Sequence, residues 1–139
     1  MHFIHCGNPD GLILALKDML DTTDPILGQC VLNTIIIENL SAYYWDLKCH
    51  PRQEAVKWYL DLLQLCHVLK ERYMCNVVVT MWDKNFERGF NSRTVPDLEP
   101  RKLDDLTYTP MEFFQNADYV LAARAGGNLQ YTAGQWREL

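Results

Sequence analysis

A carboxylate ends the most apolar segment of the sequence, and this placement could serve nucleotide chemistry. The segment TIIIENLSAYYWD spans residues 34–46, and Glu38 follows three isoleucines directly. A buried parallel strand typically has such a run, and its carboxyl end is where α/β proteins bind ligands. An acid at that point can help to hold the magnesium ion of a bound nucleotide. Glu38 and the adjacent Asn39 are therefore the first candidates for a nucleotide site.

The sequence lacks the motif that would complete such a site. A phosphate loop reads GxxxxGK[ST], and its backbone amides, lysine and hydroxyl hold the phosphates and the magnesium ion. The glycine pair in GNPDGLIL, residues 7–14, has neither this spacing nor the Lys-Ser/Thr ending. Without the loop, Glu38 has no phosphate-bound metal to coordinate. We therefore interpret it as a partly exposed acid at a sheet edge, and we expect no catalytic residue and no cofactor.

Composition and charge narrow the class of protein. The chain has 139 residues, of which 48% are hydrophobic and 12% aromatic, which is typical of one globular domain. Its 13 basic and 18 acidic residues give a net charge of −5, which argues against a domain whose own surface is a nucleic-acid footprint. No apolar run approaches the roughly 20 residues that cross a bilayer, and no signal peptide opens the chain.

The cysteines indicate a reducing compartment rather than a disulfide framework or a metal site. Their number is odd and their spacing wide, unlike that of small secreted scaffolds. A zinc site would need CxxC or HxxxH spacing, which the sequence does not contain. We therefore expect buried thiols and ordinary histidines, and no bound metal. The five cysteines are Cys6, Cys30, Cys49, Cys66 and Cys75.

Hydrophobic periodicity predicts an α/β fold. Asn8 is a plausible helix cap and Pro9 fits the first helical position. The continuous apolar run at 31–39 predicts a parallel strand that is covered on both faces. The expected elements are a strand at 2–6, a helix from Pro9 to about 20, strands at 31–39 and 76–82 around a helix at 52–73, a loop at 83–110, a short helix at 111–117 and a hairpin turning at Gly126-Gly127. We thus expect a mostly parallel central sheet flanked by helices, with a C-terminal antiparallel hairpin.

This order of elements and the segment TIIIENLSAYYW resemble the second half of a RecA-family recombinase core. The likeness is greatest to the eukaryotic recombinase paralogues, in which the strand of the second nucleotide motif leads through Asp, Ser or Asn and LSA to aromatic residues. IIIENLSAYYW matches that pattern best in the X-ray-repair paralogue, and the small Shu-complex subunits are the other candidates. The resemblance covers residues 2–131, but only 34–45 is a specific motif.

The chain departs from this family at the nucleotide site. Glu38 stands where the family has Asp, and Met81-Trp82 follow Thr80 where the family often has a polar residue that senses the γ-phosphate. The resemblance therefore implies one RecA-like domain, 1–139, that lacks the N-terminal phosphate-loop portion. By this resemblance we expect Glu38, Asn39 and Thr80 to be degenerate nucleotide-site positions and the protein not to be an enzyme.

The resemblance also implies partners and a cellular role. Such paralogues act in a heteromeric complex with another recombinase paralogue and a zinc-binding SWIM-domain protein. The complex helps to load or stabilise the recombinase filament on single-stranded DNA during homologous-recombination repair, which places the protein in the nucleus. Two alternatives remain open: a RecA-like structural subunit of a tRNA-modifying Elongator-type ring, and an ATPase whose phosphate loop lies upstream of residue 1.

Two segments are candidates for contacts with those partners. Tyr43, Tyr44 and Trp45 directly follow the acidic strand, where a loop would place them outward, and aromatic clusters are enriched at protein interfaces. The alternative is that one or two of the three pack under the following helix. The segment 83–102 has five basic residues, including Lys84, Arg88 and Arg93, with phenylalanines between them. Because four acidic residues offset the five basic ones, a solvated loop is the better interpretation, and any DNA contact would be auxiliary to that of more basic subunits.

Overall fold

The computed structural model divides into two compact units, residues 1–81 and 82–139, and each is described here by itself. The residues that the structure describes are 1–21, 27–83, 103, 107–123 and 127–139.

The first helix of unit 1, α1, spans Pro9–Asp18 and begins as the sequence predicts. The side chain of Asn8 caps it, with Oδ1 accepting a hydrogen bond from the backbone N–H of Gly11 at 2.7 Å. Pro9 occupies the first turn, where its missing N–H costs nothing. Leu12 and Leu16 form the buried face of α1, which packs against the long helix of the unit.

That long helix, α3, spans Arg52–Tyr73 and confirms the predicted helix at 52–73. The buried residues of α3 recur at helical spacing and so form one face: Tyr59, Leu62, Cys66 and Leu69. The helix ends at Met74, which adopts the left-handed conformation with φ 51° that glycine usually takes at this position.

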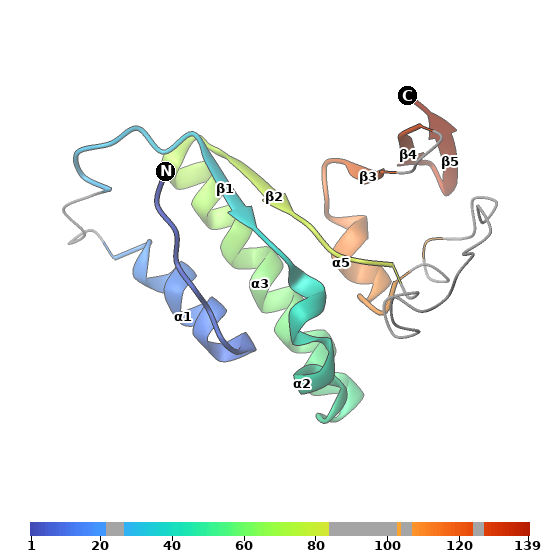
Figure 1. Ribbon diagram of the computed structural model, residues 1–139, viewed down its shortest axis with the longest axis horizontal. Helices are drawn as coiled ribbons and strands as arrows, with labels where there is room; N and C mark the ends of the chain where they lie inside the picture. The colour runs from blue at the N-terminus through green and yellow to red at the C-terminus, as the bar shows by residue number, and fades with distance from the viewer. Residues whose placement is uncertain (22–26, 84–102, 104–106, 124–126) are drawn as a thin grey trace. The chain divides into compact units, whose positions relative to one another are not determined.

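Two parallel strands lie beside α3, as Figure 1 shows. β1 (Thr34–Ile37) pairs with β2 (Asn76–Val79), so that Ile35 lies opposite Val77 and Ile36 opposite Val78. The chain passes between them through a 3₁₀ helix, η1 (Leu40–Tyr43), then α2 (Tyr44–Lys48) and α3.

The expectation that this sheet is buried on both faces is wrong. Ile35 and Ile37 are buried, whereas Ile36 is 59% exposed and its neighbour Val78 is 45% exposed. Successive side chains of a strand point to opposite faces, so the exposed pair lies together on one face. An apolar run predicts double burial only where helices cover both faces, and here α3 covers one.

The predicted strand at 2–6 is also wrong, because the structure gives these residues no strand hydrogen-bonding pattern. The segment is instead attached at its end, where the hydroxyl of Tyr43 donates a hydrogen bond to the carbonyl oxygen of Cys6 at 2.8 Å. A short apolar run becomes a strand only when a neighbouring strand supplies its ladder.

Unit 2 contains a short helix and a three-stranded antiparallel sheet. The helix α5 spans Met111–Gln115, and the strands β3 (Val120–Ala122), β4 (Leu129–Thr132) and β5 (Gln135–Glu138) follow in that order across the sheet. The predicted short helix is confirmed, and β3 and β4 form the antiparallel pair of the predicted hairpin, although Gly126 of its predicted turn lies outside the described residues. The sheet continues into β5, which was not predicted, and β3, β4 and β5 form a sheet separate from that of β1 and β2.

The turn between β4 and β5 explains why sequence analysis missed the last strand. Ala133 and Gly134 both have positive φ, 51° and 82°, as a two-residue hairpin turn of type I′ requires. Asn-Gly or Asp-Gly is the usual signal for that turn, and Ala-Gly is a weak one.

The α/β class is thus confirmed, with a short parallel sheet and a separate antiparallel one. The narrower expectations, a RecA-like core and a single domain over 1–139, stay predictions. Among the described residues, none of the helices has the length and apolar character to span a bilayer.

Candidate functional site

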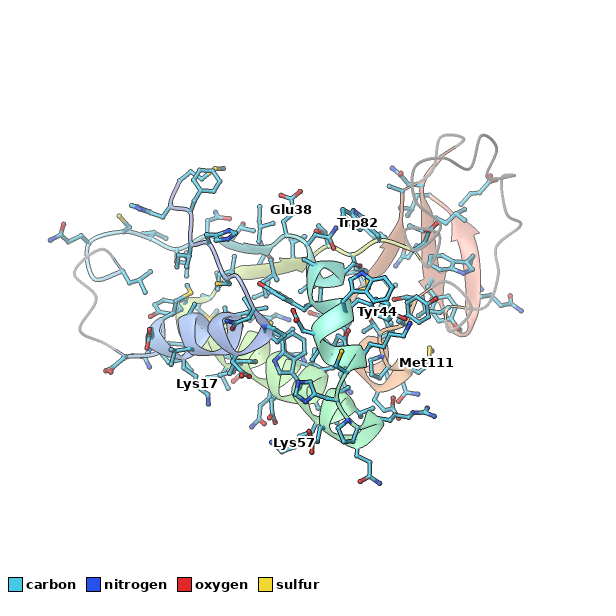
Figure 2. All side chains as sticks on the ribbon, turned by 60° about the horizontal axis from the view of Figure 1, so that its bottom comes forward. Lys17, Glu38, Tyr44, Lys57, Trp82 and Met111 are labelled. Carbon is cyan, nitrogen blue, oxygen red and sulfur yellow. The ribbon has the colours of Figure 1, made fainter. Side chains whose placement is uncertain are left out.

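The structure brings the three residues predicted as degenerate nucleotide-site positions to the carboxyl ends of the parallel strands. Thr80 directly follows β2, and its backbone N–H donates to the carbonyl oxygen of Ile37 at 3.0 Å. Its own carbonyl oxygen accepts from the N–H of Leu40 at 2.8 Å. Glu38 lies between these two attachment points, and its side chain is exposed. Figure 2 shows Glu38 projecting from the sheet on the side away from α3.

Asn39 stabilises the start of the 3₁₀ helix η1. Its Oδ1 accepts a hydrogen bond from the N–H of Ser41 at 2.8 Å, so the side chain caps η1. The peptide bond between Glu38 and Asn39 is cis. In the described part of the chain, no group of three or more His, Cys, Asp or Glu side chains is arranged to hold a metal ion. The site thus presents one carboxylate and one hydroxyl, which suit hydrogen bonding and ion pairing.

The three consecutive aromatic residues have different environments. Tyr43 is buried, with its ring edge-on to Trp58 at a centroid distance of 6.1 Å. Burial raises the pKa of the Tyr43 phenol, and the nearby Cys6 thiol raises it further. The first aromatic residue therefore belongs to the core of unit 1, and its predicted role as an interface residue stays untested.

Trp45, by contrast, is 56% exposed, although it lies in a helix and not in the loop that was expected. Its ring meets that of Tyr44 edge-on with centroids 5.0 Å apart. The ammonium nitrogen of Lys48 lies 4.9 Å from the Trp45 ring centroid and 5.1 Å from that of Tyr44. These distances are within the range of cation–π attraction. We call Tyr44, Trp45 and Lys48 the aromatic–lysine cluster.

Lys48 was not among the residues predicted to contact a partner. Its signal was the spacing to the two aromatic residues, which lie three and four positions earlier and so share its side of a helix. That signal was hidden because the segment was expected to be a loop.

The weak DNA-contact candidates Lys84, Arg88 and Arg93 lie outside the described residues. Their role stays a prediction.

The two buried cysteines, Cys66 and Cys75, lie in surroundings that disfavour the thiolate. Burial raises the pKa of the Cys66 thiol to about 11, and it raises that of Cys75 against the lowering effect of a backbone hydrogen bond. A thiol with a raised pKa is a poor nucleophile at neutral pH, because the thiolate is the reactive form. These two cysteines therefore act as small apolar core residues.

Unit 1 is thus an α/β unit with an acid at the end of a parallel strand, in a chain without a phosphate loop. Residues 2–125 match the family model described as Shu complex component Psy3, DNA-binding description, and the chain belongs to this family. The resemblance to the small Shu-complex subunits is confirmed. No curated protein matches the chain. Membership in this family supports a role as one subunit of a heteromeric, recombination-related assembly. The strands β4 and β5 lie beyond the matched residues.

Proposed function

We propose that this protein is a non-catalytic subunit of a Shu-type complex that promotes assembly of the recombinase filament during homologous-recombination repair in the nucleus. The observation that carries the proposal is the family match over residues 2–125, which includes all of unit 1 except Met1. The proposed partners are another recombinase paralogue and a SWIM-domain zinc protein. The match gives no support to the Elongator-type alternative.

The absence of catalysis is part of this proposal. Glu38 is exposed, Asn39 is engaged in a helix cap, and the sequence contains no GxxxxGK[ST] segment. Phosphoryl transfer depends on the positioning of phosphate and metal by that loop. In this account unit 1 is a RecA-like core that provides binding surfaces instead of a nucleotide site.

The aromatic–lysine cluster is the proposed partner contact on α2. Interface hot spots are enriched in tryptophan and tyrosine, which bury a large area and lose little side-chain entropy. The Lys48 ammonium packs against both rings, so the exposed Trp45 is already held in place before a partner arrives. A preordered anchor of this kind suits a subunit that is held in a stable complex.

In this proposal, the chain by itself contributes less to DNA binding than the other subunits of the complex do. The family description includes DNA binding, and the basic residues 84, 88 and 93 are the candidates. A chain of net charge −5 repels phosphate overall, so these residues would add to the contacts of more basic subunits.

The proposal is tested by reconstituting the complex and following recombinase filament formation on single-stranded DNA. We expect the complete complex to accelerate or stabilise filaments, and omission of this chain to abolish the effect. Glu38→Ala should leave the rate of ATP hydrolysis per assembled complex unchanged. A loss of ATP hydrolysis in Glu38→Ala would contradict the non-catalytic role. Full filament stimulation without this chain would overturn the proposed function.

A further inference from the structure

The two faces of the β1–β2 sheet differ sharply, and within the described residues of unit 1 one of them has no covering layer. Ile35 and Ile37 are buried on the face toward α3, while Ile36 and Val78 sit side by side on the other face. With exposed fractions of 59% and 45%, this pair forms a small apolar centre. Thr34 and Asn76, which are paired in register, continue the open face toward the start of the strands.

A parallel sheet with this pattern is incomplete as a structure in water. Parallel strands occur almost only where helices cover both faces, and two strands alone are marginally stable. In unit 1, α1 and α2 pack against α3, so these helices add to the layer that already covers the buried face. The layer that unit 1 lacks, within its described residues, is therefore a helix on the face that carries Ile36 and Val78.

The charge on this face selects the kind of helix. Glu38 follows Ile36 at the next position of the same face and projects away from α3 (Figure 2). Thr80, at the end of the neighbouring strand, adds a hydroxyl next to it. Neither the ion pair His50–Glu54 nor the ion pair Lys57–Asp61 involves Glu38. The open face is thus apolar at its centre and acidic at one end.

We propose that this open face, defined by Ile36, Val78, Glu38 and Thr80, is the seat of an amphipathic helix from a partner subunit. The apolar stripe of that helix covers Ile36 and Val78, and a lysine or arginine of the helix pairs with Glu38. The inference rests on the proposed function, because it assumes that the chain works within a heteromeric complex.

Charge also argues against the other occupants of such a face. Nucleic acid would place phosphate next to the Glu38 carboxylate, which is repulsive. A second copy of the chain would bring together two molecules that each have a net charge of −5. A partner helix with a basic residue gains attraction from that same charge, and complementary charge also sets its register on the sheet.

The test uses the assembled complex and a photoreactive amino acid at position 36. We expect the crosslinked peptide, identified by mass spectrometry, to come from a helical segment of a partner with apolar residues on one side and a lysine or arginine. The same probe at exposed Leu14 of α1 is the control and should give a different pattern. A crosslink from position 36 to a second copy, or to a segment of the same polypeptide, would overturn the inference.

Charge reversal tests the proposed ion pair. Glu38→Lys should weaken assembly about tenfold or more, because like charges at an interface are strongly unfavourable. Reversal of the basic residue found by crosslinking should restore it. Glu54→Lys, which reverses an exposed acid on α3, is the matched control and should have little effect. If the complex assembles normally with Glu38→Lys, the inference fails while the proposed function stands; if no heteromeric complex forms with the natural sequence, the proposed function itself fails.

Discussion

The Tyr43 hydroxyl donates a hydrogen bond of 2.8 Å to the carbonyl oxygen of Cys6, a residue 37 positions earlier in the chain. This bond ties the N-terminal segment to the end of β1, through η1. It takes the place of the ladder bonds that the predicted strand at 2–6 would have made. The N-terminal segment is thus held in unit 1 by a side-chain contact close to its end.

Removal of that hydroxyl should loosen the N-terminal segment without unfolding the unit. We expect Tyr43→Phe to lower the free energy of unfolding by about 1 kcal/mol, the usual net value of such a bond. Hydrogen–deuterium exchange of residues 2–8 should rise. Tyr119→Phe, at an exposed position, is the control and should change neither quantity. Unchanged exchange in Tyr43→Phe would show that this bond does not hold the segment.

Two leucines of α3 give a matched test of where the core lies. Leu62 is fully buried and Leu60 is 39% exposed, although they are only two residues apart. Leu62→Ala should lower the free energy of unfolding by about 2–5 kcal/mol, as expected for a large-to-small change in a core. Leu60→Ala should cost well under half as much, because much of its side chain is already in water. Chemical denaturation measures both, and equal costs would argue against the burial of Leu62.

The Cys66 thiol makes the stability of unit 1 depend on pH in the alkaline range. Its pKa rises from 9.0 to about 11 on folding because burial disfavours the thiolate. The neutral thiol is therefore the form that the folded state favours, and its contribution is complete below pH 9. As pH rises from 9 to about 11, the free energy of unfolding should fall by about 2–3 kcal/mol on this account.

A comparison of variants isolates this effect from other groups that titrate at high pH. Cys66→Ala should be less stable at pH 8 but should lose less stability between pH 9 and 11 than the natural sequence does. Cys49→Ala, which removes an exposed thiol, should retain the natural pH dependence. Identical slopes for Cys66→Ala and the natural sequence would contradict a raised pKa at Cys66.

Trp45 is the residue whose loss should affect partner binding most without affecting the fold. Trp45→Ala removes the proposed anchor, and we expect an affinity loss of about 2 kcal/mol or more, which is the threshold for an interface hot spot. The thermal stability of the chain should change little. Tyr119→Ala, at another exposed aromatic residue, should retain full affinity. Calorimetry with the purified partner measures both, and natural affinity in Trp45→Ala would exclude the aromatic–lysine cluster as the anchor.

Local signals predicted α1 and α3 well, missed η1 and α2, and predicted the sheets poorly. Asn8 and Pro9 mark the start of α1, and the long apolar period of α3 gives nearly its true bounds. The strand at 2–6 and the second buried face of β1 were wrong because both depend on neighbours far away in sequence. β5 escaped notice because its turn uses Ala133 in a conformation that alanine rarely adopts.

In the candidate site too, the features that depend on local sequence were predicted, and those that depend on packing were not. The apolar run before Glu38 placed that residue at the end of a strand, and the resemblance to the recombinase paralogues singled out Thr80 on the neighbouring strand. The sequence could not separate Tyr43 from Trp45, since adjacent residues of a helical segment face different directions that only the packing reveals. Nor could it recognise Lys48 as part of the aromatic cluster without the helix α2.

The most direct test of the central claim is affinity purification of the tagged protein from its own cells, with identification of the proteins that accompany it. The account predicts a recombinase paralogue and a SWIM-domain protein in stable proportion, with both reduced by Trp45→Ala and unaffected by Tyr119→Ala. Recovery of Elongator-type partners, or of neither expected subunit, would contradict it.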